Sequence, residues 1–169
     1  NKNVYKEILL LSSNLKVIGR AGIGVDNIDI DYATSKGIIV MNTPHGNSIT
    51  TAEHTIAMIM SLARQIPDAN VSTKKGKWEK SKFVGTEITG KKLGLIGCGN
   101  IGSIVVDRAK GLKMNVQVYD PFLTDDKSKE LGIEKVSFEN LLASSDIISI
   151  HTPLTCLLYT SPSPRDSAL

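Results

Sequence analysis

The clearest indication of chemical function in this chain is a glycine pattern that an acidic residue follows at a set distance. Three glycines directly after a strand-like run at residues 92–96 form a G-x-G-x-x-G pattern: Gly97, Gly99 and Gly102. Asp120 ends the next apolar stretch. Its distance from the glycines is close to the spacing of about 20 residues at which dinucleotide-binding folds place a ribose-binding acid. The arrangement predicts a phosphate-binding turn before a helix at residues 101–112.

Each glycine has a separate physical task in such a turn. Gly97 allows the sharp change of direction, and Gly99, which has no Cβ, lets a pyrophosphate approach the backbone. Gly102 lets the helix pack closely on the strand, and the helix N-terminus offers free N–H groups to phosphates. The Asp120 carboxylate can accept hydrogen bonds from both ribose hydroxyls and would repel a 2′-phosphate, which predicts NAD rather than NADP. A turn that binds nothing and a site for another adenosine ligand stay open as alternatives.

The composition is that of an ordinary globular protein, with 41% hydrophobic and 22% charged residues among 169. There is no run of 18 apolar residues and no signal-like opening, so we expect no membrane span and no membrane partner. Cys98 and Cys156 form no disulfide framework, which favours a cytoplasmic location. The three histidines lack metal-ligand spacing, so no metal site is expected.

A cluster of lysines surrounds Trp78: Lys74, Lys75, Lys77, Lys80 and Lys82. Lysines beside an aromatic ring can mark a nucleic-acid surface. No binding motif accompanies them, so we interpret the cluster as part of a solvated connection and expect no nucleic-acid partner.

The first part of the chain has an alternating helix and strand pattern. We expect a helix at 4–11, a strand at 15–19, a helix at 27–35 that Gly37 ends, and a strand at 38–41. The last strand is a continuous apolar run, which predicts burial on both faces. The pattern brings Arg20 and Asn42 to the same strand ends.

A long helix is expected next, at residues 50–65. Thr50 and Glu53 fit a capping box, and apolar residues surround the helix, which predicts burial between two domains. Pro67 is expected to end this helix, and residues 68–90 are expected to form a connection.

From residue 91 onward, strands alternate with helices. Strands are expected at 92–96, 116–119, 134–136 and 147–150, with helices at 101–112, 126–131 and 138–143. This alternation predicts an α/β fold with a Rossmann-type doubly wound parallel sheet. His151, Thr152 and Pro153 follow the last strand and therefore share the ligand edge with the glycines and Asp120.

Four blocks in order identify a family resemblance: GRAGIGVDNID at 19–29, NTPHGNS with AEHT at 42–55, LGLIGCGNIG with VYD at 93–120, and SDIISIHTPL at 145–154. The chain resembles the NAD-dependent D-isomer-specific 2-hydroxyacid dehydrogenases over residues 1–155. The resemblance implies a partial flavodoxin-like substrate domain at 1–46 and a partial NAD-binding domain at 47–155. It also implies a homo-oligomer.

The resemblance assigns roles to particular residues. Substrate-binding positions are Arg20, Ala21, Gly22 and Asn47. The first three match the turn that meets the anionic groups of the substrate, and Asn47 matches a polar residue at the domain hinge that faces the substrate. Cofactor-binding positions are Ile23, Gly97, Gly99, Asn100, Ile101, Gly102, Asp120, His151, Thr152 and Pro153. His151 could be mistaken for the catalytic base, but the family places that histidine further along. Cys98 could be an acidified thiol at a helix N-terminus, although a small residue filling the turn is the better interpretation.

The implied activity is oxidation of a small anionic 2-hydroxyacid with hydride transfer to NAD. The resemblance is strongest to members that convert 3-phosphoglycerate to 3-phosphohydroxypyruvate at the start of serine biosynthesis. Glyoxylate, hydroxypyruvate and lactate-type substrates stay open, as does an NAD-sensing, corepressor-like binding module.

The sequence also departs from the family. The arginine, glutamate and histidine that carry out hydride and proton transfer lie further along in the family, so no catalytic residue is assigned here. The resemblance stops at Thr155, and residues 156–169 have no helical or strand period and look non-native. We therefore interpret the chain as an internal fragment that is inactive by itself.

Overall fold

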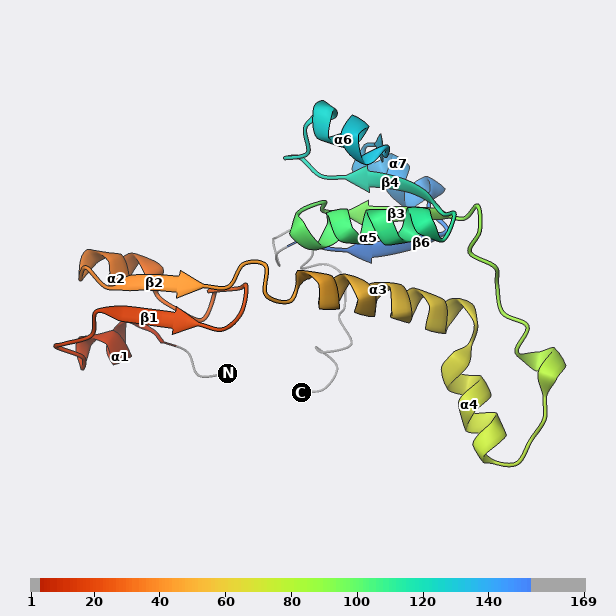
Figure 1. The fold of residues 1–169 in the computed structure, drawn as a ribbon, viewed down its shortest axis with the longest axis horizontal. Helices are drawn as coiled ribbons and strands as arrows, with labels where there is room; N and C mark the ends of the chain where they lie inside the picture. The colour runs from red at the N-terminus through yellow and green to blue at the C-terminus, as the bar shows by residue number, and fades with distance from the viewer. Residues whose placement is uncertain (1–3, 153–169) are drawn as a thin grey trace. The chain divides into compact units, whose positions relative to one another are not determined.

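The computed structural model describes residues 4–152, and the chain divides into two compact units between Thr50 and Thr51 (Figure 1). No helix among these residues has both the length and the apolar character needed to cross a bilayer. Each unit contains its own parallel sheet, one with two strands and one with four. The predicted tail at 156–169 and Pro153 lie outside the described residues.

The first unit contains α1 (Lys6–Leu10), β1 (Val17–Arg20), α2 (Ile30–Ser35) and β2 (Ile39–Asn42). The two strands pair in parallel, and their register sets Arg20 opposite Asn42, which confirms that both residues lie at the same strand ends. Gly37 follows α2 with φ of 67°, the left-handed conformation expected of a residue that ends a helix.

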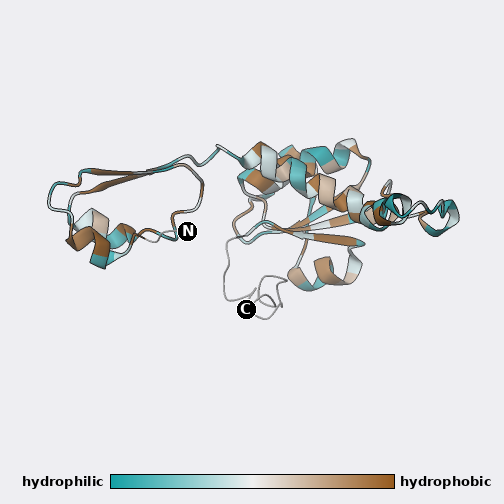
Figure 2. Cartoon of the chain, turned by 90° about the horizontal axis from the view of Figure 1, so that it is seen from below, coloured by the Kyte–Doolittle hydropathy of each residue, from teal (hydrophilic) through white to brown (hydrophobic). Residues whose placement is uncertain are grey.

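Two expectations for this unit were wrong. Val4 does not belong to the helix at 4–11; it forms a parallel bridge with Ile28, and its N–H donates to the Asn27 carbonyl at 2.7 Å. The strand β2 is not buried on both faces, because Ile39 is 59% and Met41 55% exposed. The helices α1 and α2 cover one face of the strand pair (Figure 2), where they build a small core of Leu9, Ala33 and Ile38.

The long helix α3 (Ser48–Ala63) begins two residues earlier than predicted, so the capping box of Thr50 and Glu53 does not start it. The predicted burial around the whole circumference was also wrong. Ala52 and Ile59 are buried in the core of the second unit, whereas Leu62 is 72% exposed. An apolar circumference therefore does not predict how much of α3 this chain itself buries.

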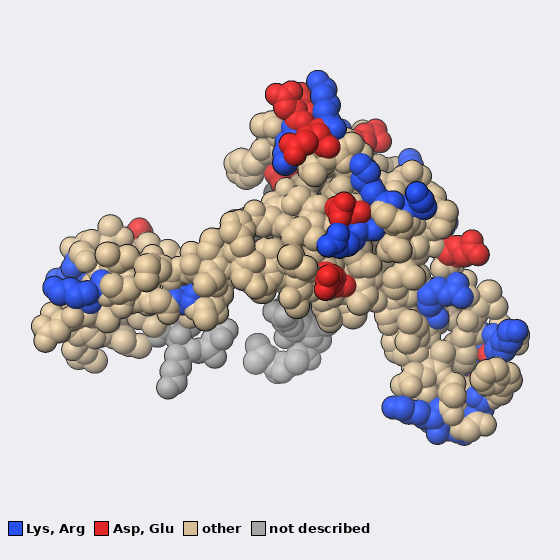
Figure 3. Space-filling model, viewed as in Figure 1, with Lys and Arg blue, Asp and Glu red and all other residues tan. Residues whose placement is uncertain are grey.

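Pro67 does not end a helix but lies in the first turn of another, α4 (Ile66–Lys74). A proline fits there because the first N–H groups of a helix have no intrahelical partner. Gln65, with φ of 53°, separates α3 from α4. The predicted connection thus contains α4 and the short 3-10 helix η1 (Lys80–Lys82). Figure 3 shows Lys and Arg side chains gathered over this segment.

The second unit contains β3 (Lys92–Ile96), β4 (Asn115–Tyr119), β5 (Glu134–Lys135) and β6 (Ile147–Ile150). All pair in parallel in the order β5-β4-β3-β6. Helices α5 (Asn100–Gly111), α6 (Asp125–Leu131) and α7 (Phe138–Ser144) connect them. The predicted α/β fold is confirmed, and the order is that of one half of a doubly wound sheet with a fourth strand.

Helices cover both faces of this sheet (Figure 2). On one face, α3 and α5 pack on β3, with Leu93, Leu95 and Val105 fully buried. On the other face, Gly94 lies against α7, where a Cβ would come within 2.8 Å of a Leu141 methyl. This packing fixes the carboxyl ends of the strands, from which the candidate site projects.

Candidate cofactor site

The turn between β3 and α5 has the geometry that its glycines predict. Gly97 adopts φ of 93°, which favours glycine, and a Cβ there would lie 2.8 Å from the His151 carbonyl oxygen. A Cβ on Gly102 would lie 2.5 Å from the Gly97 carbonyl oxygen. The first glycine therefore permits the turn, and the last permits α5 to approach it closely.

The middle of the turn is open. Gly99 caps α5 with ordinary extended backbone angles, and a Cβ on it would meet nothing within 4 Å. Asn100 is exposed and Ile101 is half-buried. The first N–H groups of any α-helix lack intrahelical partners and carry partial positive charge. The open side of Gly99 and this helix start are suited to an anionic group such as a pyrophosphate.

Asp120 follows β4 and contacts the same turn. Its Oδ2 accepts the Cys98 N–H at 2.7 Å, and its Oδ1 accepts the Phe122 N–H at 2.8 Å. The sequence predicted that Asp120 and the glycines share an edge, but it did not predict this direct bond. The available signal was that β3 and β4 are neighbouring strands that end together.

His151 and Thr152 border the turn from the end of β6. The His151 N–H donates to the Ile96 carbonyl at 2.8 Å, and its Nε2 lies 2.9 Å from Ser149 Oγ. Burial lowers the pKa of His151 below its usual value, which favours the neutral ring. The Thr152 side chain faces Gly97, where a Cβ would meet its methyl group at 2.6 Å.

Cys98 does not have the properties of an acidified thiol. Burial raises its pKa, and the neighbouring Asp120 carboxylate raises it further. Both effects oppose formation of the reactive thiolate. The interpretation of Cys98 as a small residue within the turn fits this environment better than a redox role.

Three of the candidate substrate residues, Arg20, Ala21 and Gly22, lie in the first unit at the carboxyl end of β1. The Gly22 N–H donates to the Arg20 carbonyl at 3.0 Å, and the Gly22 carbonyl accepts the Thr43 N–H at 3.1 Å. A Cβ on Gly22 would lie 2.5 Å from an Arg20 guanidinium nitrogen, so the arginine folds over this glycine. Ala21 is exposed.

Asn42 ties the two strand ends together, because its side-chain amide donates to the Ile23 carbonyl at 2.8 Å. Asn42 was not among the predicted site residues, although its predicted place at the same strand ends as Arg20 was the available signal. Asn47 is exposed immediately before α3.

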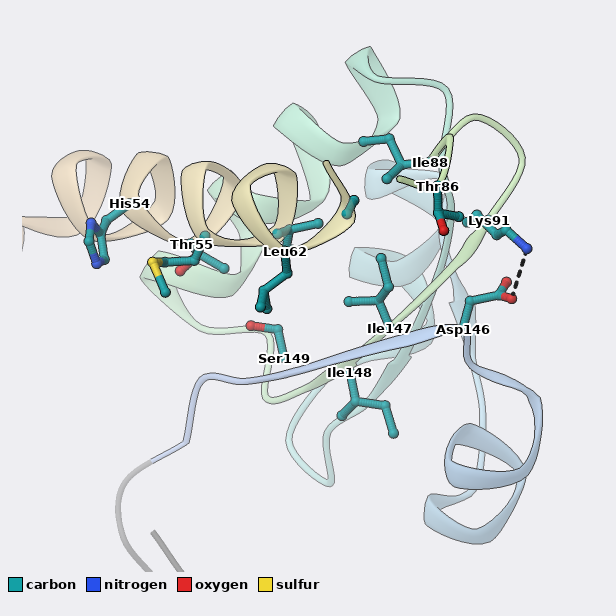
Figure 4. Close-up of a pocket in the computed structure, with 13 residues that line it drawn as sticks. His54, Thr55, Leu62, Thr86, Ile88, Lys91, Asp146, Ile147, Ile148 and Ser149 are labelled. Atoms are coloured by element: carbon teal, nitrogen blue, oxygen red, sulfur yellow. Dashed lines mark hydrogen bonds and ion pairs between the residues drawn. The ribbon is translucent and has the colours of Figure 1, made fainter. Parts of the chain in front are cut away.

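A hollow of about 570 Å³ lies elsewhere in the second unit, between α3 and β6 (Figure 4). Its lining includes Leu62, Ile88 and Ile147, and an ion pair of Lys91 and Asp146 at 3.3 Å closes one end. None of the predicted site residues lines it. Its apolar walls lack the phosphate-binding features of the glycine turn, so the turn is the better candidate for the cofactor.

Residues 4–152 bring together no group of three possible metal ligands.

The turn fits NAD by chemistry as well as by shape. Open backbone at Gly99 and the start of α5 suit a pyrophosphate, and Asp120 supplies acceptors for ribose hydroxyls. At Gly97 and Gly102 any side chain would collide with backbone atoms. These two glycines are therefore needed for the conformation of the turn, whatever it binds.

Comparisons with known proteins agree with this geometry. Residues 56–157 match the family described as "D-isomer specific 2-hydroxyacid dehydrogenase, NAD binding domain". The chain is 52% identical over 152 residues to D-3-phosphoglycerate dehydrogenase of Bacillus subtilis, covering 90% of this chain and 29% of that protein. It therefore spans less than a third of the length of this curated relative.

Two solved structures share the fold. A D-lactate dehydrogenase from Aquifex aeolicus, complexed with NAD and lactic acid, matches with a TM-score of 0.81 and 36% identity, over 90% of this chain and 46% of that one. An NAD-dependent formate dehydrogenase from Staphylococcus aureus, in complex with NAD, matches with a TM-score of 0.80 and 31% identity, over 91% and 46%. The chain belongs to the D-isomer specific 2-hydroxyacid dehydrogenase family, in its NAD-binding domain.

Proposed function

We propose that this chain is part of an NAD-dependent dehydrogenase that oxidises 3-phosphoglycerate to 3-phosphohydroxypyruvate, the first step of serine biosynthesis. The observation that carries the proposal is the glycine turn with Asp120 bonded to it, in a chain 52% identical to a D-3-phosphoglycerate dehydrogenase. The domain division proposed here assigns residues 1–46 to substrate binding and residues 47–155 to NAD binding.

The residues of this chain would bind and orient the reactants. Arg20 would hold an anionic group of the substrate with its planar guanidinium, with Ala21, Gly22 and Asn47 beside it. Gly97, Gly99, Asn100, Ile101 and Gly102 would hold the pyrophosphate, and Asp120 the ribose. Ile23, His151, Thr152 and Pro153 would border the cofactor. NAD, when bound, supplies the carbon that accepts the hydride.

Two further properties belong to the proposal. We infer a homo-oligomer in the full-length protein, which is supported by large exposed apolar side chains such as Trp78 at 84% and Leu62 at 72%. The cysteine usage supports a cytoplasmic location.

The test uses the full-length protein that contains this sequence. Absorbance of NADH is followed with 3-phosphoglycerate, D-lactate or D-glycerate as substrate at saturating NAD. We expect the highest kcat/KM with 3-phosphoglycerate. A preference for an unphosphorylated 2-hydroxyacid would contradict the substrate assignment, and NAD binding without turnover of any substrate would favour the binding-module alternative.

A further inference from the structure

The Asp120 carboxylate uses both of its oxygens on backbone N–H groups within the candidate site. Oδ2 accepts from Cys98, the residue between the first two glycines of the turn, and Oδ1 accepts from Phe122. The side chain is half-buried, so water competes for these bonds less than it would at the surface. A residue expected to read the ribose is thus also bonded to the loop expected to bind phosphate.

A second bond joins the same two segments. The Gly97 N–H donates to the Tyr119 carbonyl at 2.9 Å, so successive amides of the turn bond to successive residues at the end of β4. The charge of Asp120 also reaches the Cys98 side chain, whose pKa it raises after the larger effect of burial. The backbone bond thus holds the end of β4 against the turn, and the carboxylate bond to Cys98 adds a second connection beside it.

We propose that Asp120 is a positioning residue for the phosphate-binding turn in addition to its expected role as a ribose acceptor. This inference rests on the proposed NAD function. A carboxylate has about four acceptor positions, so two backbone bonds leave room for two ribose hydroxyls. The same side chain can therefore hold the turn in shape before the cofactor arrives and contact the nucleoside afterwards.

The proposal can be tested because charge and positioning have effects of opposite sign on a bare anion. Removing a negative charge near a phosphate site should tighten binding of pyrophosphate through electrostatics alone. Removing the bond between Asp120 and the Cys98 N–H should weaken pyrophosphate binding, because the turn must then become ordered when the anion binds. Pyrophosphate has no ribose, so the ribose contact does not enter this comparison.

The experiment measures inorganic pyrophosphate and NAD affinity of the full-length protein that contains this sequence, by titration calorimetry at fixed ionic strength. The variants are Asp120→Ala and, as a charge-matched control, Asp126→Ala in the exposed first turn of α6. We expect pyrophosphate affinity to fall about tenfold in Asp120→Ala, or about 1.4 kcal/mol, and to stay equal or rise slightly in the control. An equal or higher pyrophosphate affinity in Asp120→Ala, with weaker NAD binding, would show that Asp120 serves the ribose alone.

Amide hydrogen exchange at Cys98 gives a readout that does not need a ligand. We expect exchange at least about tenfold faster in Asp120→Ala than in the unmodified protein, since alanine has no side-chain acceptor for the Cys98 N–H. In a Cys156→Ser background, the pKa of the Cys98 thiol should also fall, because the charge that raises it has gone. Unchanged exchange at Cys98 would refute the positioning role. Failure of the unmodified full-length protein to bind NAD would instead refute the proposed function.

Discussion

At the scale of single residues, we propose complementary tasks for two charged side chains at strand ends. Arg20 ends β1 in the first unit and Asp120 follows β4 in the second. Parallel strands of α/β folds bring ligand-binding residues to their carboxyl ends. A cation suits an anionic substrate, whereas an anion suits ribose hydroxyls and disfavours a 2′-phosphate. Substitutions at the two positions should therefore affect different ligands.

Asp120→Ser should change the choice of cofactor in the full-length protein. The unmodified protein should prefer NAD strongly, because a 2′-phosphate would approach a half-buried carboxylate. The variant should shift the NADP to NAD ratio of kcat/KM toward NADP by about 10- to 100-fold, the equivalent of about 1–3 kcal/mol. Steady-state kinetics with each cofactor measure the ratio. Equal use of both cofactors by the unmodified protein would refute the assignment.

Arg20→Ala should affect the substrate and spare the cofactor. We expect the KM for 3-phosphoglycerate to rise about tenfold or more, since a charged hydrogen bond is lost, while the Kd for NAD stays within about twofold. Arg20→Lys keeps the charge without the planar fork. Its KM for 3-phosphoglycerate should therefore lie between those of the unmodified protein and Arg20→Ala. A weaker NAD affinity with an unchanged KM would place Arg20 at the cofactor instead.

His151 should make folding stability depend on pH. Its folded pKa lies below the usual value of about 6.5 because the ring is buried, so the unfolded chain takes up the proton first as pH falls. Stability should be constant above about pH 6.5 and decrease below it until the folded pKa is reached. Urea unfolding between pH 5 and pH 8, values chosen to bracket the usual histidine pKa, measures this. His151→Asn should flatten the decrease, whereas His54→Asn, at an exposed position on α3, should retain it.

At the scale of elements, three glycines of one strand-turn-helix unit have different surroundings and should respond differently to alanine. A Cβ at Gly102 would meet backbone at 2.5 Å, whereas Gly99 and Gly111 have nothing within 4 Å. Gly102→Ala should destabilise the chain by about 1–3 kcal/mol through overpacking. Gly111→Ala, in the last position of α5, should be neutral or stabilise by up to about 1 kcal/mol.

Gly99→Ala separates folding from binding. Its backbone angles are ordinary and its Cβ would project into open space, so the unfolding free energy should change by less than about 1 kcal/mol. Its NAD affinity should nevertheless fall, because the methyl group would occupy the expected pyrophosphate position. Chemical denaturation and NAD titration of the three variants measure both effects. If Gly99→Ala left the NAD affinity unchanged, the result would contradict a phosphate site at this turn.

The elements also show what a sequence can predict. The strand β3, the turn and α5 were predictable because glycine spacing and apolar runs are local signals. The exposure of β2 and α3 was not predictable, because an apolar run indicates that a segment tends to be buried but not which element buries it. Pro67 suits both the end of one helix and the start of the next, and only the φ of 53° at Gln65 separates the two. The bond between Asp120 and Cys98 joins distant positions, and the sequence indicated only that both lie where neighbouring strands end, not that they are bonded.

At the scale of the whole molecule, β6 forms one edge of the second unit's sheet as residues 4–152 build it. Among the described residues, β6 pairs only with β3, and Ile148 and Ile150 are 41% and 47% exposed. The apolar hollow beside α3 runs along the same strand (Figure 4). An edge with unpaired backbone groups and apolar side chains on both faces favours pairing with another chain.

We therefore expect the 169-residue chain to self-associate at micromolar concentration, and Ile148→Lys to reduce the association. A lysine on an edge strand resists pairing because its charge would have to be desolvated against the next strand. Val84→Lys is the matched control, since Val84 is exposed in the segment before β3 and outside any strand. Sedimentation velocity over a concentration series measures the effect. If both lysine variants weakened association equally, net charge would be responsible, and the open edge of β6 would not be the surface through which the chains meet.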